Sequence, residues 1–320
     1  MKAFSTLTLI ILPGFLMGQS IEQYRSVLLL LQNKLSNTPT EIAIRSFIRD
    51  TQQVFLIVQP DSMYTHVEPA RNYTVNATTW RFLRKQWAER PYIKAIVAAG
   101  HRDALEHNAG IEGFKTRDKG ISLTVDLCPS HKPLDKRIFM ALITACSSNE
   151  LPVPIGLAIS GQWLLFHPDD LKWLKSLVDQ KEIDLTWINH TRHHHFNKDL
   201  PLDKNFLLSM GTDIKSEVLG NEELMLKQGI LPSCFFRFPG LISTKRVFDQ
   251  ILDWGLIPIG TDAWLAKGQY PKASGSIVLI HANGNEPIGV EVFIRLLQKK
   301  NSDLNKGQWK MLDLRDELSQ

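Results

Sequence analysis

The chain has 320 residues, of which 43% are hydrophobic and 22% are charged, an ordinary globular composition with room for one large domain or two smaller ones. Its formal net charge of +4 at pH 7 is too small to indicate a nucleic-acid-binding protein. The three cysteines, Cys128, Cys146 and Cys234, are odd in number and far apart, which excludes a disulfide framework and leaves open one bridge or buried free thiols.

The first 18 residues have the pattern of a secretory signal peptide. Lys2 supplies a basic tip, Leu7–Met17 is a short apolar run, and Gly18 is a small residue at the expected cleavage point. The run is short and is broken by Pro13, so stable membrane insertion is not expected after cleavage. We therefore expect a periplasmic or secreted mature protein; an uncleaved anchor is the alternative.

Residues 19–114 are expected to form a mainly helical N-terminal extension that packs on the domain that follows. The sequence predicts a helix over Ile21–Leu35 and a buried strand over Val54–Val58. Trp80–Ile96 has a helical pattern that Pro91 interrupts. We find no chemical motif in this part of the chain.

From residue 115 to residue 320 the pattern changes to strands that alternate with helices. This alternation predicts an α/β fold, a distorted (β/α) barrel, in which catalytic groups gather where the strands end. The predicted strands are Ile121–Asp126, Pro154–Gly161, Ile183–Ile188, Phe235–Phe238, Leu256–Gly260 and Ile277–His281. The predicted helices are Lys136–Ala145, His167–Val178, Lys245–Trp254 and Gly289–Lys299.

A histidine cluster follows the strand that ends at Ile188. His190 and His194 are four residues apart, so on a helical turn their rings would share one face and hold one metal ion, usually zinc. His193 and His195 would then point elsewhere. The alternative is a solvated His-rich loop without a metal.

Five short motifs in this part of the chain resemble those of the polysaccharide deacetylases of the NodB-homology group, carbohydrate esterase family four. The resemblance covers residues 120–298. The motifs are Thr124-Val125-Asp126-Leu127-Cys128-Pro129, His190-Thr191-Arg192-His193-His194, Arg237-Phe238-Pro239, Asp262-Ala263-Trp264 and Leu279-Ile280-His281.

The resemblance implies an exported, metal-dependent hydrolase that removes acetyl groups from an N-acetylated or O-acetylated polysaccharide. It implies that Asp126 is the general base, that His190 and His194 are metal ligands, and that His281 is the general acid. A Lewis acid, a base and an acid around one carbon are what amide cleavage needs.

The resemblance assigns supporting roles to five more residues. Arg237 would hold Asp126, and Asp262 would balance charge nearby; the alternative is a purely structural ion pair between Arg237 and Asp262. Leu279, Trp264 and Pro239 would line the substrate pocket.

The first motif departs from the family pattern, because Leu127 stands where the family has its third metal ligand, an aspartate. Catalytic zinc normally keeps three protein ligands. We expect His190 and His194 to bind a divalent ion weakly, with Asp126 drawn into the shell, and we expect Leu127→Asp to raise the metal affinity.

Other outcomes stay open at this stage. The third ligand can come from His193, His195, His131 or Glu286, or the metal can be lost. Two alternative functions stay open as well: a catalytically impaired carbohydrate-binding homologue that has lost the metal, and a hydrolase of another C–N amide bond.

Overall fold

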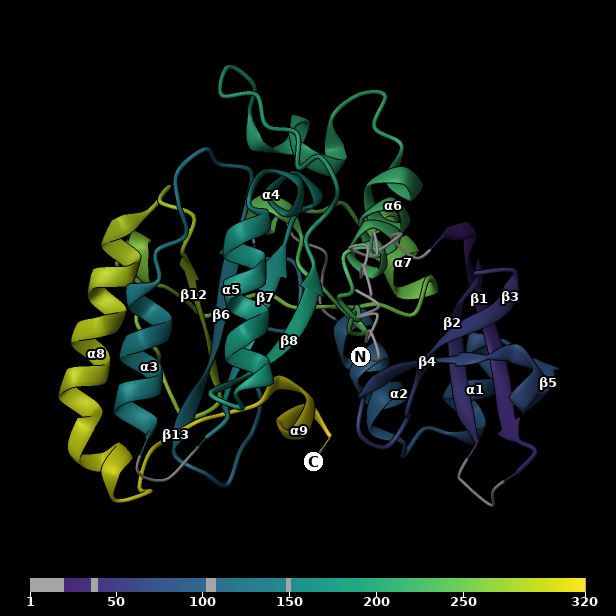
Figure 1. Cartoon of the computed structure of the whole chain (residues 1–320), viewed down its shortest axis with the longest axis horizontal. Coiled ribbons are helices and arrows are strands. Elements are labelled where there is room, and N and C mark those ends of the chain that lie inside the picture. Colours follow the sequence, from purple (N-terminus) through teal and green to yellow (C-terminus); the bar gives the residue numbers. More distant parts are fainter. Residues whose placement is uncertain (1–19, 36–39, 102–107, 148–150, 320) are drawn as a thin grey trace, which may run out of the picture.

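The computed structural model describes residues 20–35, 40–101, 108–147 and 151–319 (Figure 1). The predicted signal peptide, residues 1–18, lies outside the described residues. Two sheets organise the chain, an antiparallel sheet near the N-terminus and a parallel sheet after it. Within the described ranges, no helix is both long and apolar enough to cross a membrane.

The parallel sheet confirms the predicted α/β fold, with strand order β10-β9-β8-β7-β6-β12-β11 and β13 paired to β6. Its strands are β6 (Gly120–Leu127), β7 (Val153–Ile159), β8 (Ile183–Asn189), β9 (Phe235–Phe236), β10 (Ile257–Pro258), β11 (Ala263–Trp264), β12 (Ser276–His281) and β13 (Lys310–Met311). Ile111 bridges to Ile259 beyond β10, and Gly113 bridges to Ser276 of β12. Residues 111–113 therefore connect the β10 edge of the sheet to β12. Because this connection is made by single bridges and not by a regular strand, the barrel is distorted.

Helices follow the strands as predicted, and α3, α5 and α8 cover one side of the sheet (Figure 1). The helices are α3 (Arg137–Cys146), α4 (Gly161–Phe166), α5 (Pro168–Asp179), α6 (Ile214–Lys227), α7 (Lys245–Asp253), α8 (Pro287–Asn305) and α9 (Leu314–Leu318). Short 3-10 turns lie at η1 (Ala70–Asn72), η2 (Leu202–Lys204), η3 (Phe206–Leu208), η4 (Pro239–Leu241) and η5 (Leu265–Lys267).

The two faces of β6 explain where the site forms. Leu123, Val125 and Leu127 are buried in one hydrophobic cluster with residues of α3, α5 and α8. Because side chains alternate along a strand, Thr124 and Asp126 face the opposite way, into the barrel. The apolar residues of β6 thus hold the helices, while its polar residues are left for the site.

The N-terminal part is mainly a sheet, so the prediction of a helical extension is wrong. Its strand order is β4-β3-β2-β1-β5. The elements are β1 (Ile21–Asn33), β2 (Glu41–Arg49), β3 (Gln52–Val58), β4 (Thr65–Pro69), β5 (Tyr73–Ala77), α1 (Trp80–Gln86) and α2 (Pro91–Gly100). The strand predicted over Val54–Val58 and the break at Pro91 are confirmed. The helix predicted over Ile21–Leu35 is strand β1, because a run of apolar residues fits either element and β1 pairs with β2 and β5.

The N-terminal sheet shares a hydrophobic core with the barrel. Ile44 and Phe47 of β2 are buried in the same cluster as Phe236 of β9 and Phe248 of α7. In Figure 1 this sheet stands beside α6 and α7. Because one continuous hydrophobic core joins the N-terminal sheet to the barrel, this sheet is part of the structure of the side of the barrel on which it packs.

A buried ion pair ties the two parts together. Arg45 of β2 and Glu222 of α6 both have side chains with 0% exposure, and Arg45 Nε lies 2.6 Å from Glu222 Oε2. Arg45 Nη2 donates to Glu222 Oε1 at 2.9 Å, and Tyr24 on β1 donates its hydroxyl to Glu222 Oε2 at 2.9 Å. The carboxylate thus receives hydrogen bonds from two strands of the N-terminal sheet.

We predict that Arg45→Met lowers the free energy of unfolding by about 3–5 kcal/mol, because it leaves the Glu222 charge buried without its partner. Adding Glu222→Gln should recover part of this loss, since the uncompensated charge is then removed. Urea unfolding followed by circular dichroism measures both. Lys227→Met is the matched control on the same helix, because its pair with Glu223 is half-exposed and is worth about 1 kcal/mol or less. Equal losses for Arg45→Met and Lys227→Met would contradict the prediction.

Candidate active site

The carboxyl ends of the parallel strands surround a pocket of about 500 Å³. In the register of the sheet, His281 at the end of β12 pairs with Asp126 on β6, and Asp126 pairs with Ala158 on β7. Asp126, His190, His194, Trp264, Leu279 and His281 all line this pocket. The strand-end rule therefore brings most of the predicted site residues together.

The two histidines meet in a loop and not on a helical turn, which corrects the prediction. Residues 190–198 have no helical structure, and Thr191 and His194 have φ values of 66° and 52°. His190 Nε2 and His194 Nε2 lie 3.1 Å apart. A positive φ is strained for a β-branched residue such as Thr191, so neighbouring contacts must hold this loop.

Helix α6 supplies most of these contacts, although the sequence did not predict it. Asn221 of α6 donates to Asn189 Oδ1 at 2.9 Å, and the same oxygen accepts the backbone N–H of Thr191 at 3.0 Å. Glu217 of α6 accepts the backbone N–H of His193 at 2.9 Å and contacts its ring Nδ1 at 2.6 Å. His193 is thus paired with Glu217 at the rim of the pocket.

Cys128 completes a group of three ligand-type side chains with His190 and His194. Its Sγ lies 3.4 Å from His190 Nε2, and one donor atom from each of the three residues lies within 4.8 Å of the others. The sequence contained a signal for this, because Cys128 is two residues beyond Asp126, and the alternation of β6, continued one residue past its end, places both on the pocket side. Sequence reasoning missed it, because it considered only Asp126 and other histidine and glutamate side chains as the third ligand.

Leu127 faces away from the pocket. Its side chain has 0% exposure and is buried in the cluster between the sheet and helices α3 and α8. A carboxylate at this position would therefore lie in an apolar core, and the gain in metal affinity expected for Leu127→Asp no longer follows. Asp126 lies outside the three-residue group, so Cys128 is the third ligand-type side chain that the structure places with His190 and His194.

The chemistry of the three donors fits a zinc-type ion. A thiolate and two imidazoles are preferred zinc ligands, and the thiolate compensates the positive charge. His190 Nδ1 donates to the Arg237 carbonyl at 2.9 Å, which fixes the ring and directs the Nε2 lone pair toward Cys128 and His194. Burial lowers the pKa of His190 to about 4, so its imidazole is neutral, as a ligand must be.

The electrostatics of Cys128 also favour a ligand. Burial disfavours its thiolate, but the nearby His194 and His281 rings outweigh that effect and lower the pKa of Cys128 to about 7. Cys234, which is equally buried and donates to the Met63 carbonyl at 3.5 Å, has its pKa raised by burial to about 12. Of these two thiols, only Cys128 lies where a thiolate is stabilised.

Asp126 lies beside the three donor side chains and is held there by Arg237. Its Oδ1 lies 3.4 Å from Arg237 Nη1, and its Oδ2 lies 3.7 Å from His190 Nε2. Arg237 is fully buried, and its Nη2 donates to Thr124 at 2.9 Å. Within the described part of the chain, the buried Asp126 Oδ1 accepts no hydrogen bond, which is unusual for a buried carboxylate, and the Arg237 guanidinium beside it compensates its charge.

His281 has an acidic partner, Glu286, that the sequence did not predict in this role. Its Nδ1 lies 2.8 Å from Glu286 Oε2, and Trp264 donates its indole N–H to the same oxygen at 2.7 Å. Burial opposes the imidazolium, but Cys128 and Glu286 outweigh it, so the pKa of His281 lies well above its usual value. Glu286 therefore both orients the ring and favours its protonated form.

Several predicted residues lie elsewhere. Asp262 accepts a hydrogen bond from Ser276 at 2.8 Å, at the opposite end of β12 from His281, so it is not placed to balance charge in the pocket. Pro239 is buried, and its neighbours Gly240 and Leu241 line the pocket in its place. His131 packs on Phe166 and His195 is exposed at the rim.

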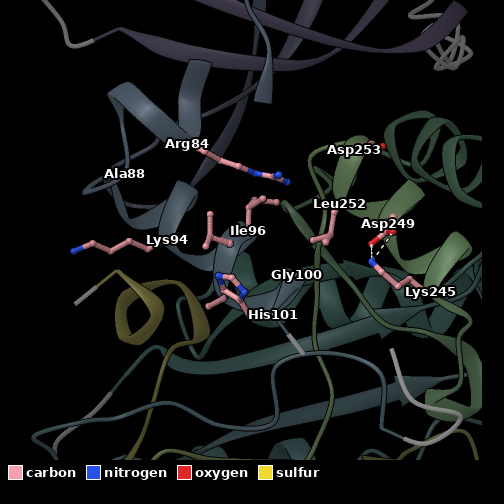
Figure 2. Close-up of a pocket in the computed structure, with 12 residues that line it drawn as sticks. Arg84, Ala88, Lys94, Ile96, Gly100, His101, Lys245, Asp249, Leu252 and Asp253 are labelled. Atoms are coloured by element: carbon pink, nitrogen blue, oxygen red, sulfur yellow. Dashed lines mark hydrogen bonds and ion pairs between the residues drawn. The ribbon is translucent and has the colours of Figure 1, made fainter. Parts of the chain in front are cut away.

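A second hollow of about 820 Å³ lies between α2 and α7 (Figure 2). Its charged groups include Arg84, Lys94, Lys245 and Asp249, and Lys245 is already paired with Asp249 at 2.8 Å. The lining contains none of the motif residues and no cluster of ligand-type side chains within the described ranges. The pocket at the strand ends is therefore the candidate site, although this hollow is larger.

Comparisons with known families and with solved structures each found matches. A family described as the RP012 protein N-terminal domain matches residues 22–87, which form the antiparallel sheet and α1. The solved structures that are similar in fold include carbohydrate esterases and a pseudoenzyme of family four. A family four carbohydrate esterase from Bacillus anthracis is 18% identical, with a TM-score of 0.48, over 72% of this chain and 93% of that chain.

Two further solved structures are similar. PdaA of Bacillus subtilis, a family four carbohydrate esterase, is 16% identical, with a TM-score of 0.45, over 68% of this chain and 94% of that chain. A family four pseudoenzyme from Bacillus anthracis is also 16% identical, with a TM-score of 0.44, over 66% of this chain and 69% of that chain.

We predict that Cys128→Ser weakens zinc binding by more than about 100-fold, because loss of a direct ligand should exceed the 10- to 100-fold cost of losing a partner of a ligand. Competition with a chromogenic chelator measures the affinity. Cobalt provides a second readout, since a cobalt–thiolate bond absorbs in the near ultraviolet and a cobalt–imidazole bond does not. Cys234→Ser is the matched control, a buried thiol away from the pocket, and should leave both signals unchanged. A normal cobalt–thiolate band in Cys128→Ser would contradict the assignment.

Proposed function

We propose that the chain is an exported metal-dependent hydrolase that removes acetyl groups from an N-acetylated polysaccharide, with Cys128, His190 and His194 as the metal ligands. The observation that carries the proposal is the pairing of this donor group with a carboxylate and an imidazole on adjacent strands, Asp126 and His281. A pure binding site has no need for a base and an acid so placed.

A bound divalent ion would supply Lewis acidity for the acetyl carbonyl. Asp126 accepts the proton of the attacking water through Oδ2, while Arg237 holds the carboxylate in place through Oδ1. His281, whose imidazolium is favoured by Cys128 and Glu286, gives a proton to the leaving amine when the C–N bond breaks. The two groups thus begin the reaction in the protonation states that their roles require.

Export remains part of the proposal and rests on the pattern of residues 1–18. It places the mature chain in the periplasm or outside the cell, where acetylated polysaccharides are accessible. The alternatives, an impaired carbohydrate-binding homologue and a hydrolase of another amide, predict a different outcome in the next experiment.

We predict that the zinc-loaded protein releases acetate from chitooligosaccharides or peptidoglycan fragments, and that chelation abolishes the release. Asp126→Asn should reduce the rate by about 100-fold or more, because it removes the base and not a ligand. Retained zinc binding in this variant is the control that separates the two roles. Glycan binding without acetate release from any acetylated glycan would support the binding homologue instead.

We further predict that Glu286→Gln lowers kcat by about tenfold or more, because an amide neither orients nor stabilises the His281 imidazolium as a carboxylate does. Asp262→Asn is the matched control, since Asp262 is the acidic residue that the motif comparison would have chosen. Glu286→Asp should restore part of the activity. The pH profile of kcat should lose its alkaline plateau in Glu286→Gln alone, since the His281 pKa then falls; the reverse pattern for the two variants would contradict the assignment.

A further inference from the structure

Phe196 follows the histidine cluster and presents an aromatic ring at the mouth of the pocket. It lines the pocket and its side chain is 54% exposed. One face of its ring stacks on Phe206, with centroids 5.3 Å apart and planes at 18°. Phe206 in turn packs edge-on against His194 at 5.1 Å. The exposed face of Phe196 is therefore two ring contacts away from a metal ligand.

The backing ring is fixed by its surroundings. Phe206 is 7% exposed and has a φ of 55°, so its backbone is held in a conformation that aromatic residues rarely adopt. A Cβ atom at Gly240 would meet Phe206 Cε2 at 2.5 Å, so only glycine leaves space for the ring. Strain and close packing of this kind are maintained where the position of a side chain matters.

A compact loop of residues 195–206, which we call the Asn205 loop, carries Phe196. Its ends are joined by a hydrogen bond from the Phe206 N–H to the His195 carbonyl at 2.9 Å. Asn205 is fully buried in it, and its amide nitrogen lies 3.0–3.1 Å from the carbonyls of Asn197, Leu200 and Pro201. Its Oδ1 accepts the Asn197 N–H at 2.6 Å. The loop is thus closed on itself and presents Phe196 without further ordering.

The other aromatic ring at the pocket is already occupied. Trp264 has the Lys267 ammonium 3.4 Å from its ring centroid, and its ring lies 5.6 Å from that of His281. Its indole N–H is taken by Glu286. Among the described residues that line the pocket, Phe196 is therefore the aromatic side chain with a free face.

We infer that Phe196 is a stacking platform for a pyranose ring next to the acetylated sugar, so that the pocket takes a chain of sugars and not a single one. This inference rests on the proposed function. The C–H face of a pyranose is apolar and carries partial positive charge, and it therefore fits the negative face of an aromatic ring. A platform that is already rigid binds such a ring with little loss of conformational entropy.

The test compares chitohexaose with the monosaccharide N-acetylglucosamine on the full zinc-loaded protein. Phe196→Ala should weaken chitohexaose binding by about three- to tenfold, as expected for loss of one stacking contact, and leave N-acetylglucosamine binding unchanged. In the acetate-release assay the same variant should raise KM for chitohexaose without lowering kcat. Phe196→Trp should restore the affinity, since it keeps the aromatic face.

Phe166→Ala is the matched control, because Phe166 is 56% exposed and packs on His131, outside the pocket. Equal affinities of wild type and Phe196→Ala for chitohexaose would overturn the platform while leaving the deacetylase proposal intact. Binding of chitohexaose that depends on Phe196, without acetate release, would support the platform and overturn the deacetylase. No binding of chitohexaose or of N-acetylglucosamine by the wild type would overturn both.

Discussion

The buried charge of Glu222 is the constraint on which the rest of the structure depends. A carboxylate with no exposure must have all its lone pairs satisfied, and here Arg45, Tyr24 and Asn189 supply the donors. These donors come from β2, β1 and the end of β8. One helix residue therefore sets the distance between the N-terminal sheet and the barrel, and any displacement of one part breaks hydrogen bonds in the other.

The same network reaches the metal ligands. Asn189 donates to the Val218 carbonyl of α6 at 2.9 Å, and its own oxygen accepts from Thr191 and Asn221. These bonds maintain the positive φ of Thr191, which turns the chain so that His190 and His194 face each other. Among the described residues, no side chain of the antiparallel sheet lines the pocket, yet the sheet stabilises the helix that positions the histidine loop.

The sequence predicted the barrel elements well because fully buried parallel strands are uninterrupted apolar runs with clear ends. Two errors have physical causes. Val27–Leu31 is as apolar as a barrel strand, and no local signal shows that its partners are the antiparallel strands β2 and β5. Helix α6 was missed because buried polar residues such as Asn221 and Glu222 interrupt its apolar face.

The site was predictable where it depends on strand ends and unpredictable where it depends on loops. Asp126, Arg237 and His281 follow from strand ends that share one edge of the sheet. The pairing of Glu286 with His281 could not be predicted, because it depends on a turn whose course only the folded chain defines. Asp262 also follows a predicted strand, but it lies beside Ser276 at the opposite end of β12 from His281. The reason is that β11, which begins directly after Asp262, pairs with the middle of β12 and not with its carboxyl end.

The position of Cys128 changes what a leucine at position 127 implies for a metal site. A site with two neutral imidazoles would have to recruit Asp126 as a ligand, and a carboxylate bound to a cation is a poor base. In the proposed site a thiolate at Cys128, one residue past the end of β6, would supply the negative charge instead. Asp126 would then stay outside the ligand shell, with Oδ1 paired to Arg237 and Oδ2 left as the oxygen that accepts a proton. Leucine at 127 is consistent with this arrangement, because the side chain that follows Asp126 belongs to the core beneath α3 and α8, and the ligand comes from the next residue.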